Sequence, residues 1–117
     1  MANPNLLALT SIKNDTAILE VTTSAADLIA AVATNHAFLV EAIFAANIHA
    51  TVVGWISVIH KRSGTDHYIT YQQRIPLKTT INVLLGKSLY LFEGDSLRVL
   101  ANASSNVTAE APYSDMS

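Results

Sequence analysis

The four histidines, at positions 36, 49, 60 and 67, are the first side chains to consider for metal binding or acid–base chemistry. None of them has the i, i+4 or His-x-His spacing of a compact metal site. His60 and His67 lie near the two ends of a predicted hairpin, so a metal-assisted hydrolase would need them together with Asp66 as a third ligand. The favoured interpretation is that they hydrogen-bond to solvent or to a neighbour, and we predict no metal site.

Glu93 and Asp95 flank Gly94 and form the most compact pair of carboxylates in the chain. Such a pair can serve acid–base catalysis or bind calcium. A Glu-Gly-Asp sequence between two strands is more simply a turn, in which Gly94 supplies a positive φ and Asp95 bonds back to the backbone. We therefore predict a structural turn of Glu93, Gly94 and Asp95.

Nucleophilic and phosphate-binding motifs are absent from the sequence. The chain has no cysteine, no Gly-x-Ser-x-Gly elbow and four glycines in all, none of them in a phosphate-binding loop. We expect no catalytic residue, no cofactor and no enzymatic activity.

Trp55 and the tyrosines Tyr68 and Tyr71 are the aromatic residues that suggest a binding surface, and two interpretations are open for each. Trp55 lies in the most apolar segment, where it would be a core residue or an interface anchor. Tyr68 and Tyr71, with Gln72 and Gln73, would form either a mixed-polarity hairpin face or a sugar-binding face, because carbohydrate sites combine aromatic stacking with amides. A receptor- or glycan-binding module is thus an alternative function.

The charge content points to partners other than nucleic acid or membrane. Only 14% of the residues are charged and the net charge is −2, without the basic stripe of a nucleic-acid-binding protein. The apolar stretches are interrupted by Glu41, Asn47 or His49 and are too short to span a bilayer.

Half of the residues are hydrophobic, which favours burial of surface in a partner, such as other copies in a homo-oligomer. The candidate interface residues are Phe38, Val53, Trp55, Ser57, Ile59, Tyr68 and Tyr71.

The elements that carry these residues are expected to be strands. Short runs rich in Val, Ile and Thr alternate with turn-forming clusters. Alternation over 38–46 puts Phe38, Val40, Ala42 and Phe44 on one face, and similar alternation occurs from Leu97 and from Val107. Residues 51–60 are apolar on both faces, which suits a central strand or one that meets a neighbouring subunit.

The connections between these strands are expected to be short. Ser63-Gly64-Thr65 predicts a hairpin between 51–61 and 66–74, and Glu93-Gly94-Asp95 similarly joins 87–92 to 96–103. Two strands, 7–13 and 16–22, are predicted on either side of Asn14-Asp15, and one more over 77–83.

The segment 24–34 is the one place where a helix competes with a strand. Ser24-Ala25-Ala26-Asp27 resembles a capping sequence, yet we favour a strand with a loop because it continues the series of strands. About eight strands with short connections predict an all-β, antiparallel β-sandwich or jelly roll, formed by a single domain over residues 1–117.

Three segments near the two ends of the chain stand out: residues 1–13 (Met-Ala-Asn-Pro-Asn-Leu-Leu-Ala-Leu-Thr-Ser-Ile-Lys), 22–25 (Thr-Thr-Ser-Ala) and 88–98 (Ser-Leu-Tyr-Leu-Phe-Glu-Gly-Asp-Ser-Leu-Arg). In these segments the chain resembles a family of small virion structural proteins from tailed bacteriophages, notably marine and cyanobacterial ones. The resemblance continues through Ala101-Asn102-Ala103-Ser104 and a final strand with Tyr113, whereas the segment Lys61–His67 is individual to this chain.

This resemblance implies a non-enzymatic virion component, made in the host cytoplasm and located in the phage particle. The favoured role is a capsid decoration (cement) subunit that stabilises the head, in contact with the major capsid protein. A neck or tail ring subunit, or a fibre-associated subunit in contact with neck or tail proteins, is the alternative.

Overall fold

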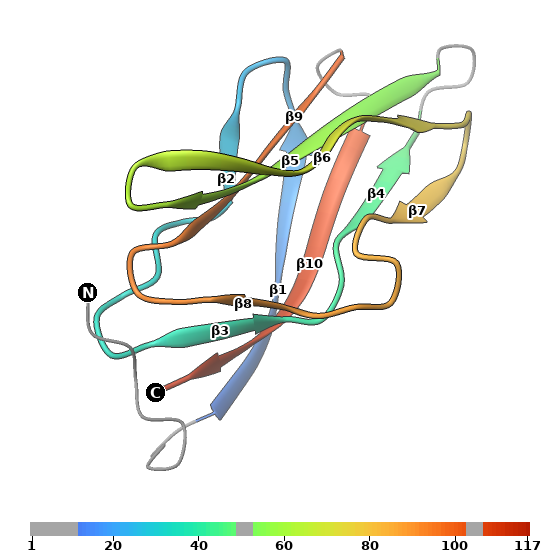
Figure 1. The fold of residues 1–117 in the computed structure, drawn as a ribbon. Helices are drawn as coiled ribbons and strands as arrows, with labels where there is room; N and C mark the ends of the chain where they lie inside the picture. Colours follow the sequence, from blue (N-terminus) through green and yellow to red (C-terminus); the bar gives the residue numbers. More distant parts are fainter. Residues whose placement is uncertain (1–11, 49–52, 103–106) are drawn as a thin grey trace.

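The computed structural model describes residues 12–48, 53–102 and 107–117, and these form ten strands and no helix (Figure 1). The all-β class predicted from the sequence is therefore confirmed, with ten strands in place of about eight. The strands are β1 (Ile12–Val21), β2 (Ala26–Ile29), β3 (Ala37–Val40), β4 (Phe44–Asn47), β5 (Gly54–Arg62), β6 (Thr65–Ile75), β7 (Thr80–Asn82), β8 (Leu89–Leu91), β9 (Ser96–Ala101) and β10 (Val107–Met116). Among the described residues, no helix is long and apolar enough to cross a membrane.

The strands form two antiparallel sheets. Sheet A has six strands in the order β7-β4-β10-β3-β8, with β1 also paired to β10, and sheet B has the order β2-β9-β5-β6. In Figure 1 the β5–β6 hairpin runs across β1 and β10, which lays sheet B over one face of sheet A. The core between them draws on both sheets and includes Val40, Val107 and Ala109 from sheet A and Ile56, Val58, Leu97 and Val99 from sheet B. This is the predicted antiparallel β-sandwich.

β10 is the strand that organises sheet A. One of its edges pairs with β1 over the whole length, from Val107↔Val21 to Met116↔Ile12. The other edge pairs first with β4 through residues 107–110 and then with β3 through 113–116. Alternate residues of β10 point into the core, where Val107, Ala109 and Ala111 have no exposed surface.

The break between β3 and β4 corrects the prediction of one strand over 38–46. The buried positions change phase within this break, from Val40 and Ala42 to Ile43, Ala45 and Asn47. Phe44 therefore lies on the outer face. Pro112 of β10 explains the position of the break. Its carbonyl accepts the Glu41 N–H (3.0 Å), and because N–H and C=O of a strand residue share an edge, the missing proline N–H faces the same junction.

Two predicted turns are also corrected. Asn14 and Asp15 do not join two strands but lie inside β1, because pairing with β10 overrides their turn preference; residues 7–11 of the predicted first strand lie outside the described residues. Glu93-Gly94-Asp95 is a turn, but it joins no hairpin. β8 pairs with β3 in sheet A and β9 pairs with β2 and β5 in sheet B, so this turn crosses between the sheets.

The remaining predicted elements agree with the structure. The segment 24–34 contains β2 followed by a loop, and no helix. β5 lies between β9 and β6, as expected for the doubly apolar segment, although residues 51 and 52 are outside the described part of the chain. The Ser63-Gly64 turn closes the β5–β6 hairpin, with both residues at positive φ (53° and 77°).

Candidate functional site

The most densely bonded polar group in the described chain is the carboxylate of Asp95, which has no exposed surface. Arg62 donates to it from Nε (3.0 Å to each oxygen) and from Nη2 (2.6 Å). His60 Nε2 lies 3.0 Å from Oδ2, and the Phe92 N–H donates to the same oxygen over 3.0 Å. We call His60, Arg62 and Asp95 the Asp95 cluster; it ties the end of β5 to the turn between the two sheets.

The charges of this cluster are mutually stabilised. Burial on its own raises the pKa of Asp95, but hydrogen bonds from Arg62, His60 and the Phe92 amide, with the charge of Arg62, outweigh it and hold the pKa below its ordinary value. The hydrogen bond to Asp95 in turn raises the pKa of Arg62. The guanidinium carbon of Arg62 also lies 5.7 Å from the ring centre of Phe92, which adds a cation–π contact. A carboxylate held in this way is a structural clamp, since it stays ionised and fully bonded.

The three side chains considered as metal ligands, His60, Asp66 and His67, are not arranged to hold a metal ion. His60 and His67 are directly opposite each other in the β5–β6 ladder, yet the His60 ring bonds Asp95 while Asp66 and His67 are exposed. His36 forms a separate pair with Asp115 (Nδ1 to Oδ1, 2.7 Å). Over residues 12–48, 53–102 and 107–117 no group of three or more His, Cys, Asp or Glu side chains is arranged to hold a metal ion.

The predicted interface residues fall into a buried, a half-buried and an exposed group. Ser57 and Ile59 are 1% and 2% exposed, so the chain itself covers them and they offer little surface to a partner. Phe38, Val53 and Trp55 are half-buried, and the Phe38 ring stacks on Tyr113 with centroids 4.7 Å apart. Tyr68 and Tyr71 remain well exposed, at 52% and 65%.

Tyr68 and Tyr71 lie together on the outer face of sheet B. Their ring centroids are 5.1 Å apart and the rings are nearly perpendicular, at 86°. Gln72 Nε2 donates to the Tyr71 hydroxyl over 3.4 Å. The sequence identified these residues as candidates, but it gave no signal that the two rings would touch.

Sheet A presents an outer surface that the sequence analysis did not single out. Ile18 of β1 lies opposite Glu110 of β10, and Glu110 lies opposite Phe44 of β4, so the three residues form a row across the sheet. Ile18 is 65% exposed and Phe44 is 39% exposed. The phase change between β3 and β4 conceals this row in the sequence, because simple alternation places Phe44 in the core.

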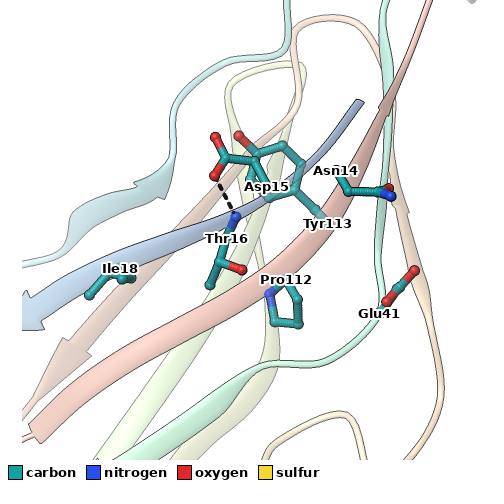
Figure 2. A pocket seen from close by; sticks show the side chains of 7 residues that line it. All are labelled: Asn14, Asp15, Thr16, Ile18, Glu41, Pro112 and Tyr113. Carbon is teal, nitrogen blue, oxygen red and sulfur yellow. Dashed lines mark hydrogen bonds between the residues drawn. The ribbon is translucent and has the colours of Figure 1, made fainter. Parts of the chain in front are cut away.

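A shallow pocket of about 550 Å³ lies beside this row, where β1 pairs with β10 (Figure 2). Its lining comprises Asn14, Asp15, Thr16, Ile18, Glu41, Pro112 and Tyr113. Figure 2 shows Asp15 beside Tyr113 and Glu41 set apart from both, so the two carboxylates do not form an acid–base pair. Burial, with the nearby charges of Asp15 and Asp115, raises the pKa of Tyr113 above its ordinary value, which keeps its hydroxyl protonated at neutral pH.

A second pocket, of about 300 Å³, lies at the end of sheet B and includes Lys61, Ser96 and Arg98. Its positive charge is partly neutralised, because Arg98 Nε lies 3.3 Å from Asp27 Oδ1. Arg98 Nη2 also donates to the Ala25 carbonyl (3.0 Å), so the guanidinium is bonded to groups of its own chain.

Comparison with known proteins adds no family to this description. No protein-family model matches the chain, and no curated protein sequence matches it. Proposals for the function of this chain therefore rest on the surfaces of its two sheets.

Proposed function

We propose that this chain is a non-enzymatic structural subunit of a tailed-phage virion, in the first instance a capsid decoration subunit that stabilises the head. The resemblance at the two ends of the sequence motivates the virion, and the outer surface of sheet A supports a subunit. The observation that carries the proposal is the combination of a long strand edge at β1 with exposed apolar side chains next to it.

β1 offers ten residues of strand edge. It pairs with β10 on one side, and no other strand of the described residues pairs with it. The register with β10 runs without a bulge from Ile12 to Val21, and this stretch contains no proline. Proteins usually shorten, kink or cover such an edge, because its free N–H and C=O groups pair readily with another chain. A partner that covers β1 would satisfy the remaining edge groups by adding a strand to sheet A, whereas the Thr16 N–H already donates to Asp15 Oδ1 over 2.7 Å.

The side chains around β1 suit the same contact. Ile18 and Phe44 flank Glu110 on the outer face, and Ile12, 63% exposed, lies further along the edge. Exposed apolar side chains gathered on one face indicate a protein contact more than scattered ones do. In a capsid lattice the contact is repeated at every equivalent position, so a modest area for each copy is sufficient.

The decisive experiment is quantitative mass spectrometry of purified particles of the phage that encodes the chain. We expect the protein in the particle, with several hundred copies if it decorates the capsid. About six or twelve copies would instead place it in a neck or tail ring. Its absence from purified, intact particles would refute the virion proposal.

A further inference from the structure

The exposed tyrosines of sheet B owe their contact to an irregular strand. Residues three apart in a regular strand point to opposite faces of the sheet. The register between β5 and β6 shifts twice, once between Ile59 and Val58 and once between Val58 and Ile56. Ile59 pairs with Tyr68, Val58 with Thr70 and Ile56 with Gln73. Tyr68 therefore lies opposite Ile59, and Tyr71 and Gln72 both fall within the other shift, next to Ser57. The contact between the two rings shows that both tyrosines lie on the same face of the sheet.

This irregularity is held in place by a buried side chain. The Ser57 hydroxyl, in a residue only 1% exposed, accepts the Gln72 N–H over 2.8 Å. Gln72 has φ of 49°, a left-handed conformation that a non-glycine residue adopts at some energetic cost. The bulges also give up regular ladder bonds on an edge strand. As a result, the two nearly perpendicular rings of Tyr68 and Tyr71 are exposed to solvent.

The surroundings of the rings are polar. Asp66, Gln72 and Arg74 on the same strand are exposed. The other large exposed hydrophobic residues of the described chain lie off sheet B and are Ile12, Ile18, Phe44, Ile48, Leu77, Leu85 and Tyr90. Two aromatic rings among hydrogen-bonding groups, with no other large exposed hydrophobic residue among the described residues of sheet B, form a surface that is smaller than the contiguous apolar patches typical of protein contacts.

We propose that the Tyr68–Tyr71 pair on bulged strand β6 is a binding surface for neutral pyranose oligosaccharides. The C–H groups on one face of a sugar ring carry slight positive charge and are attracted to the negative face of an aromatic ring. The nearby Gln72 amide, whose nitrogen bonds the Tyr71 hydroxyl, offers hydrogen-bond donors and an acceptor to sugar hydroxyls. This surface is on sheet B, so it leaves the β1 edge and the outer face of sheet A available for assembly.

The test is a titration of the isotope-labelled full chain with maltohexaose, cellohexaose, chitohexaose and mannohexaose, followed by heteronuclear NMR. We expect at least one of these sugars to bind with a dissociation constant in the millimolar range and to shift the resonances of Tyr68, Tyr71 and Gln72. Tyr71→Ala should weaken binding at least tenfold, whereas Tyr71→Phe should keep most of it because the stacking face remains. The matched control is Tyr90→Ala, which removes an exposed tyrosine from sheet A and should leave binding unchanged.

Several outcomes would overturn the proposal. One is the absence of shifts at Tyr68 and Tyr71 with all four sugars at 20 mM, a concentration of the order expected for weak stacking. Another is undiminished binding by a Tyr68→Ala/Tyr71→Ala double variant with a native circular dichroism spectrum. A third is a wild-type dimer, in light scattering, that the double variant dissociates, since the rings would then contact a second copy.

Discussion

Arg62 Nη2 lies 2.6 Å from Asp95 Oδ2, and this contact joins the last residue of β5 to the residue just before β9. Lys61 and Ser96 are partners in the antiparallel β5–β9 pair, so Arg62 and Asp95 lie side by side at the end of sheet B where the chain crosses between the sheets. The carboxylate is fully buried while the Arg62 side chain keeps 44% of its surface exposed. Asp95 is therefore the more costly partner to remove.

Asp95→Asn should lower the free energy of unfolding by about 2–3 kcal/mol, measured by urea denaturation at pH 7. The neutral amide loses the charge-assisted bonds to Arg62 and His60, although Arg62 recovers some hydration because it is half exposed. Asp66→Asn, on the exposed face of the same hairpin, is the matched control and should change stability by less than about 0.5 kcal/mol. Equal stability of the two variants would contradict a clamping role for Asp95.

The wild-type protein should lose stability in acid in part through Asp95. Because its pKa is lowered in the folded state, its contribution is complete above the unfolded pKa of about 4. The contribution is lost as the pH falls through the lower folded value. Urea denaturation at several pH values between 2 and 7 should show that the gap between wild type and Asp95→Asn narrows in acid. A gap that is constant over this range would show that Asp95 does not titrate as described.

Leu91→Ala should be among the more destabilising substitutions, at about 2–5 kcal/mol, because it empties a fully buried core position. Leu85→Ala makes the same chemical change at a residue that is 80% exposed. It should alter stability by less than about 0.5 kcal/mol. Thermal or urea unfolding of both variants measures the difference, and a similar loss for both would contradict the described core.

Ser57→Ala should lower the stability by about 1 kcal/mol, because the Gln72 N–H loses the acceptor that holds the bulge. Ser88→Ala, at an exposed serine in the loop just before β8, should have no measurable effect. Amide hydrogen exchange adds a local readout. Gln72 should exchange faster in Ser57→Ala than in wild type, and unchanged protection would argue against the bulge contact.

Ile18→Lys and Phe44→Lys should each reduce binding of the protein to phage particles at least tenfold if sheet A is the contact surface. Each substitution places a charge in a surface that loses its water on assembly. Leu85→Lys introduces the same side chain at a more exposed position away from the row and should bind normally. Co-sedimentation with particles that lack the protein measures this. Normal binding of both sheet A variants would show that the contact surface lies elsewhere on the protein.

Local sequence signals were sufficient for the features that neighbouring residues determine. The Ser63-Gly64 turn lies between two segments predicted to be strands, so the β5–β6 hairpin could be predicted. Gly94 has the positive φ expected of the turn glycine. The strand in 24–34 followed from the continuity of the series, although its alanines favour a helix.

Long-range contacts account for what the sequence did not reveal. The role of Asp95 depends on side chains 33 and 35 residues away, and the break after β3 depends on Pro112 of a distant strand. The paired bulges in β6 contain neither glycine nor proline, the residues that normally signal an irregular strand. Tyrosines three residues apart were therefore recognisable as candidates, while their contact was not.

The central position of β10 in sheet A has a consequence for the order of folding. β1, β3 and β4 are all synthesised before residues 107–116, yet each of them pairs with that strand. The β5–β6 hairpin pairs residues that are close in the sequence and needs no such late partner. During translation this hairpin can therefore form first, whereas the pairing of β1 with β10 closes a loop of most of the chain, which is a slow step. A nascent chain halted before residue 107 would leave three strands without their common neighbour and would be a target for chaperones and proteases.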